Sequence, residues 1–162
     1  MTVNHALAYL AFWSLVGATL FSLFVVFVFR SGAVYLARKR DGTLKEKVPL
    51  KGILIMAGFL ATVILFFIAA NFFGLARRQF SVGFGTLFAL NYALYLILFA
   101  FDTLIIDGFV LSFWRPDFLR LSTELNKESM KDHIIKSLPI GTGLGLVFAG
   151  LTTTIAYYSF MT

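Results

Sequence analysis

Two carboxylates lie in an otherwise apolar stretch, FDTLIIDGFVLSFW, which covers residues 101–114. A carboxylate inside a bilayer can titrate or coordinate a cation, and such groups usually face a helix bundle or water. Asp102 and Asp107 are therefore the residues of this chain best suited to moving a proton or an ion. The alternative is that they lie at the wet end of a membrane helix and contact headgroups.

Helical spacing gives Asp102 two polar neighbours. Asn91, Tyr95 and Asp102 follow steps of four and seven residues and share one face of an α-helix, which makes them the candidate intramembrane functional residues. Asp107 lies about 140° from Asp102 around an α-helix, so the two carboxylates are not expected to form a pair. Antiparallel packing of neighbouring spans places Lys51 level with Asp107, which predicts an ion pair at the inner membrane boundary.

Catalytic patterns are not recognisable in the chain. It has no Cys, and His133 is its only histidine away from the N-terminus. A single histidine without companions at ligand spacing is weak evidence for a metal or haem site. The sequence therefore predicts no catalytic residues, no metal site and no cofactor.

The elements that carry these residues are membrane-spanning helices. Hydrophobic residues make up 59% of the chain and charged residues 14%, whereas soluble proteins are about a quarter charged. Four apolar runs are long enough to cross the bilayer, at about residues 6–29, 52–75, 82–114 and 138–160. The third corresponds to about 50 Å of α-helix, so it must tilt, bend near Gly108 or run along the surface. The prediction is an all-α integral membrane protein, a four-transmembrane-helix bundle with residues 1–162 in a single domain.

Charge predicts the orientation of this bundle. Loops 30–51 and 115–137 contain 12 of the 14 Lys and Arg residues, and Arg77 and Arg78 are the other two. The positive-inside rule then places both loops in the cytoplasm and both termini outside, most naturally in a plasma or inner membrane. Loop 115–137 also predicts a short amphipathic helix at the inner surface, with Pro139 opening the last span.

Basic and small residues suggest partners. A basic cluster in the first cytoplasmic loop either only sets the topology or also attracts anionic lipid headgroups or an acidic partner: Arg38, Lys39 and Arg40. No groove-reading motif accompanies the net charge of +6, so nucleic acid is not an expected partner. Small residues repeat every four positions in the last span, a pattern for helix packing within the bundle, in a homo-oligomer or against another membrane protein: Gly141, Gly145, Ala149 and Thr153.

Three classes of function fit these features. The leading prediction is a non-enzymatic accessory, assembly or scaffold component that acts through helix packing and basic loops. The first alternative is a proton- or cation-coupled transporter or channel that uses Asp102, although the spans show no inverted repeat. The second alternative is a membrane enzyme on an apolar or lipid substrate, although the signatures of four-span membrane enzymes are missing.

Overall fold

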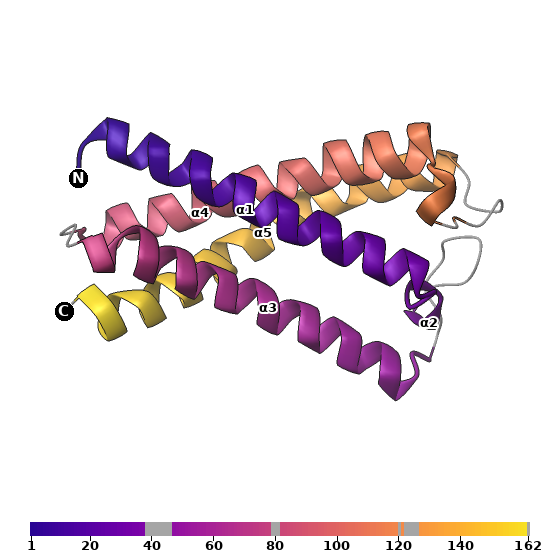
Figure 1. Ribbon diagram of the computed structural model, residues 1–162, viewed down its shortest axis with the longest axis horizontal. Coiled ribbons are helices and arrows are strands. Elements are labelled where there is room, and N and C mark those ends of the chain that lie inside the picture. The colour runs from indigo at the N-terminus through magenta and orange to yellow at the C-terminus, as the bar shows by residue number, and fades with distance from the viewer. Residues whose placement is uncertain (38–46, 79–81, 120, 122–126, 162) are drawn as a thin grey trace. The chain divides into compact units, whose positions relative to one another are not determined.

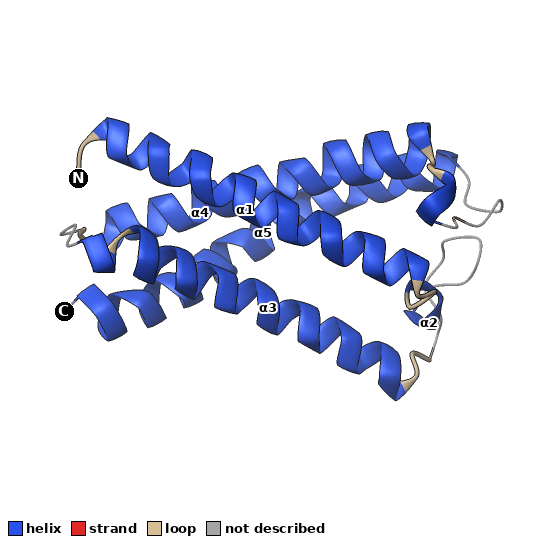
Figure 2. Ribbon diagram, viewed as in Figure 1, coloured by secondary structure: helices blue, strands red, loops and turns tan. Residues whose placement is uncertain are grey.

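The computed structural model describes residues 1–37, 47–78, 82–119, 121 and 127–161, without the side chains of 34, 37, 78, 127–134 and 161. All regular structure in these ranges is helical (Figures 1 and 2). The longer helices are α1 (Val3–Arg30), α3 (Leu50–Gly74), α4 (Phe84–Ala100), η2 (Phe101–Trp114) and α5 (Lys127–Ala156). Shorter helices are α2 (Val34–Ala37), η1 (Ala76–Arg78), η3 (Asp117–Leu119) and η4 (Tyr157–Met161).

Four helical segments are long and apolar enough to cross a membrane: Val3–Arg30, Leu50–Gly74, Phe84–Trp114 and Ile135–Phe160. The shortest has 25 residues, and about 20 suffice for a hydrocarbon core about 30 Å thick. A bilayer leaves the backbone no water to bond with, so continuous helices satisfy its polar groups internally. In the described residues, the predicted all-helical architecture is confirmed, and so is the prediction of four helices long and apolar enough to span a membrane.

The third span changes its hydrogen-bond pattern partway along. It is α-helical to Ala100 and π-helical from Phe101 to Trp114. The backbone N–H of Arg115 donates to Val110 O at 2.8 Å, an i→i−5 bond of the kind that defines a π-helix. Arg115 then adopts φ 47° and ψ 58°, and Pro116 follows, so a left-handed residue and a proline end the helix.

The last span begins earlier than the sequence suggests. The sequence predicts that Pro139 opens it, but α5 runs without interruption from Lys127 to Ala156 and contains Pro139. Proline lacks the N–H that would bond to Ile135 O, yet one missing bond does not end this helix. Whether residues 127–134 have an amphipathic face lies outside the described side chains.

The chain divides into two compact units, each drawn from all the long helical segments. The first unit contains Met1–Ala18, Ala61–Phe99 and Pro139–Thr162. Gly17 allows close packing here, because a Cβ at this position would lie 2.9 Å from Leu98 and 2.9 Å from Phe66. The core of this unit consists of buried side chains from α1, α3, the α3–α4 connection, α4 and α5: Tyr9, Phe67, Ala70, Leu75, Val82, Leu87, Leu90, Leu94 and Ala156.

The second unit contains Thr19–Leu60 and Ala100–Leu138. Its buried core is small and consists of Ile106, Leu111 and Leu119. Side chains from α1 pack against these three residues, among them Phe21 and Val25. This unit is therefore where η2 meets the C-terminal half of α1.

Candidate functional site

Asp102 and Asp107 lie on one face of η2. In a π-helix, residues five positions apart are joined by the backbone hydrogen bonds, as residues four apart are in an α-helix. The hydroxyl of Ser112 shows the same register, because it donates to Asp107 O at 2.6 Å. The 140° separation expected from α-helical geometry is wrong, because this segment is not an α-helix.

The two acids border the buried face of η2. Thr103 and Ile106 are buried, whereas Leu104 and Phe109 are exposed. Asp102 and Asp107 are both partly exposed, so each lies between the buried side of η2 and the side that faces outward. The π-helical register therefore places two acidic side chains on the same face of η2.

Lys51 and Asp107 belong to the same unit. Lys51 is exposed in the first turn of α3, and Asp107 is partly exposed in η2. Their ion pair at the inner membrane boundary stays a prediction.

Asn91 and Tyr95 of α4 both bond to α5. Asn91 is fully buried, and its side-chain Nδ2 donates to Thr153 Oγ1 at 2.9 Å. The hydroxyl of Tyr95 donates to Gly141 O at 3.0 Å. These two candidate functional residues therefore hold α4 against α5 within the first unit, whereas Asp102, the third member of the predicted face, belongs to the second.

The small residues of the last span make this contact possible. A Cβ at Gly145 would collide with the ring of Tyr95, and a Cβ at Gly141 would collide with the ring of Phe99. Ala149 and Thr153 are completely buried. The aromatic side chains of α4 thus lie directly on the backbone of α5. The small residues of this four-residue repeat pack against a helix of the same chain.

A second polar contact joins α1 to α3, and sequence reasoning did not include it among the site residues. The hydroxyl of Tyr9 donates to Asn71 Oδ1 at 3.3 Å, and both side chains are buried. Asn71 stands out in the sequence as an amide in an apolar run, but its partner is 62 residues away. The spacing of residues along one helix gives no information about such a contact.

Three buried polar atoms in this unit have no hydrogen-bond partner among the described residues: Ser14 Oγ, Asn71 Nδ2 and Asn91 Oδ1. A buried polar group left unpaired costs about 1–3 kcal/mol, so such atoms are rare in stable proteins. Two of the three belong to amides whose other atom is already bonded. Each of these amides therefore has one atom that forms a hydrogen bond, which fixes its orientation, and one atom that forms none.

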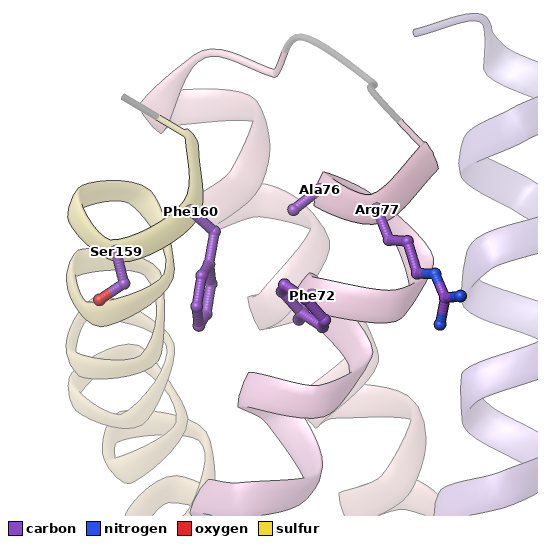
Figure 3. Close-up of a pocket in the computed structure, with 5 residues that line it drawn as sticks. All are labelled: Phe72, Ala76, Arg77, Ser159 and Phe160. Atoms are coloured by element: carbon purple, nitrogen blue, oxygen red, sulfur yellow. The ribbon is translucent and has the colours of Figure 1, made fainter.

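A recess of about 420 Å³ lies in the first unit between the ends of α3 and α5 (Figure 3). Its lining comprises Phe72, Ala76, Arg77, Ser159 and Phe160. The rings of Phe72 and Phe160 are 5.1 Å apart, whereas the Ser159 hydroxyl and the Arg77 guanidinium point away from the space between them. The space between the two rings is therefore apolar.

The basic cluster Arg38, Lys39 and Arg40 lies outside the described residues, and so does the side chain of His133. In the part of the chain that is described, no three His, Cys, Asp or Glu side chains are grouped to hold a metal ion. Comparison with family models, curated proteins and solved structures finds no match to this chain. The function must therefore be argued from the geometry of the residues above.

Proposed function

We propose that this protein is a non-enzymatic membrane component that acts as an accessory, assembly or scaffold subunit. The polar groups at membrane depth in the first unit support this proposal, because they bond to other helices of the same chain. Asn91 bonds to Thr153, Tyr95 bonds to Gly141, and Tyr9 bonds to Asn71. Such contacts hold helices together.

The observation that carries the proposal is a pair of glycines that face outward. Gly58 of α3 and Gly143 of α5 are exposed, and a Cβ at either position would meet no atom within 4 Å. A glycine inside a helix costs about 1 kcal/mol relative to alanine, so it needs a reason to be there. In lipid, glycine lets the backbone of another helix approach closely. Both glycines are therefore suited to contact with a partner helix, either from a second copy or from another membrane protein.

Photo-crosslinking in native membranes tests this proposal. A benzoylphenylalanine at Leu54, which is 63% exposed and one turn from Gly58, should give a discrete protein crosslink. The change Gly58→Leu should abolish that crosslink, because a Cβ at this exposed position meets no atom of the protein within 4 Å and the larger side chain would extend toward the partner helix. Leu104, which is 65% exposed on η2, is the control position for the same crosslinking residue. Crosslinks to lipid alone at Leu54 would show that no partner docks there.

A transporter or channel for protons or cations is the second candidate, and Asp102 and Asp107 on one face of η2 favour it. Purified protein in vesicles tests it through ion-driven flux. Flux that is lost in Asp102→Asn but kept in Asp117→Asn, where the acid is exposed in η3, would support transport. The absence of any flux from the wild-type protein favours the accessory function.

The proposal includes an orientation and a lipid environment. We infer that both termini lie on the non-cytoplasmic side of a plasma or inner membrane. The basic cluster Arg38, Lys39 and Arg40 then faces the cytoplasm, where it can attract anionic headgroups or an acidic partner. The excess of Lys and Arg in loops 30–51 and 115–137 supports this orientation.

A further inference from the structure

The helical repeat places Asn71 and Asn91 at about the same level of the first unit. Phe148 of α5 contacts Phe67 of α3 at 4.9 Å and Tyr95 of α4 at 5.9 Å between ring centroids. Asn71 is four residues after Phe67, and Asn91 is four residues before Tyr95. The helices α3 and α4 follow each other through a short connection and run in opposite directions (Figure 1). The step from Phe67 to Asn71 and the step from Tyr95 to Asn91 therefore both lead toward the end of the unit where α3 connects to α4. Each step is about 6 Å and keeps to the same helix face.

The two amides have complementary unsatisfied atoms. Asn71 Oδ1 already accepts from Tyr9, so its free atom is the donor Nδ2. Asn91 Nδ2 already donates to Thr153, so its free atom is the acceptor Oδ1. Both residues are 0% exposed, so bulk solvent does not reach either atom.

We propose that a single buried water molecule binds between Asn71 and Asn91. It accepts a hydrogen bond from Asn71 Nδ2 and donates one to Asn91 Oδ1. A direct amide–amide bond is not formed, since neither atom has a partner within bonding distance among the described residues. Buried waters typically satisfy such otherwise unpaired groups and need at least two polar partners, which the two amides supply.

The water completes a hydrogen-bonded chain through four helices. The order is Tyr9 of α1, Asn71 of α3, the water, Asn91 of α4 and Thr153 of α5. Without the water, the polar contacts form two separate helix pairs. With it, all four helices of this unit are joined at one level, so the site binds water for a structural purpose.

Nuclear magnetic resonance of the full chain, labelled with ¹⁵N at its four asparagines and held in micelles or nanodiscs, tests the site. The side-chain amide of Asn71 should show a dipolar cross-peak to a slowly exchanging water. Asn4, which is exposed at the start of α1, should show only rapid exchange with bulk water. Substitution of each asparagine in turn assigns the resonances.

Variants of Asn91 make the test specific. In Asn91→Leu the water loses its acceptor, so the Asn71 cross-peak should disappear. In Asn91→Asp an acceptor oxygen remains, so the cross-peak should persist. A wild-type Asn71 amide with no water cross-peak would overturn the proposal, and so would a cross-peak that is unchanged in a folded Asn91→Leu protein. If that variant does not fold, the presence or absence of the cross-peak in the wild-type spectrum still decides whether the water is bound.

Discussion

Several polar side chains of the first unit join its helices to one another. Tyr95 is an example, because its ring lies on Gly145 and its hydroxyl bonds to Gly141 O. The sequence identifies such residues as polar groups in apolar runs, and Asn71 and Asn91 stand out in this way. It does not reveal their partners, because Asn91 and Thr153 are 62 residues apart and only the packing of α4 against α5 brings them together.

Tyr95→Phe should destabilise the protein by about 1 kcal/mol, because the Gly141 carbonyl loses its side-chain donor while the packing of the ring is retained. Unfolding in mixed micelles by titration with a denaturing detergent measures this change. Tyr92→Phe, on the same helix, is the matched control and should change stability by less than about 0.5 kcal/mol. Equal effects of the two substitutions would contradict the hydrogen bond.

Gly145→Ala should destabilise the protein by about 1–3 kcal/mol, because the added methyl group collides with the ring of Tyr95. Gly143→Ala lies half a turn away, where a Cβ meets no atom within 4 Å. It should leave the stability of the isolated protein unchanged or raise it by up to about 1 kcal/mol through helix propensity. The same unfolding titration compares them, and a loss at Gly143 as large as that at Gly145 would refute the packing.

At the scale of elements, the π-helix decides which residues share a face. The backbone hydrogen bonds of the apolar stretch FDTLIIDGFVLSFW can form in either an α-helix or a π-helix. Composition and periodicity therefore cannot distinguish the two kinds of helix. In the sequence, Arg115 and Pro116 indicate only that a helix ends there. The left-handed conformation of Arg115 is seen in the structure alone. This is why the long apolar helix could be predicted, whereas the shared face of Asp102 and Asp107 could not.

The charges of Asp102 and Asp107 should therefore be coupled. When both acids are ionised, Asp102→Asn relieves repulsion and stabilises the protein, and the gain should be smaller if Asp107 is already Asn. A double-mutant cycle at neutral pH should give a coupling energy of about 0.5 kcal/mol or more. Additivity within about 0.3 kcal/mol would indicate that the two side chains do not share a face.

At the scale of the whole molecule, the number of spans could be predicted because it depends on local chain properties. Length and apolarity of each run identify a membrane helix without knowledge of its neighbours. The division into two compact units depends on contacts between distant segments, and no local pattern reports it. The continuity of α5 through Pro139 was likewise not predictable from proline alone.

Orientation is testable because the chain has no cysteine. Thr2→Cys and Lys47→Cys each place one thiol at an exposed position. A membrane-impermeant maleimide should label Thr2→Cys in intact cells and should label Lys47→Cys only after permeabilisation. This result follows if both termini are non-cytoplasmic and loop 30–51 faces the cytoplasm. The reverse labelling pattern would show that the basic loops face outward.

The most direct test of the accessory function is the mass of the particle released from its own membrane in a lipid-retaining polymer. The wild-type protein should run as a stoichiometric complex, either with a second copy or with another membrane protein. Gly58→Leu should reduce this particle to a single chain, because it blocks helix contact at α3 without disturbing the fold. A wild-type particle that already contains one chain and only lipid would contradict the account.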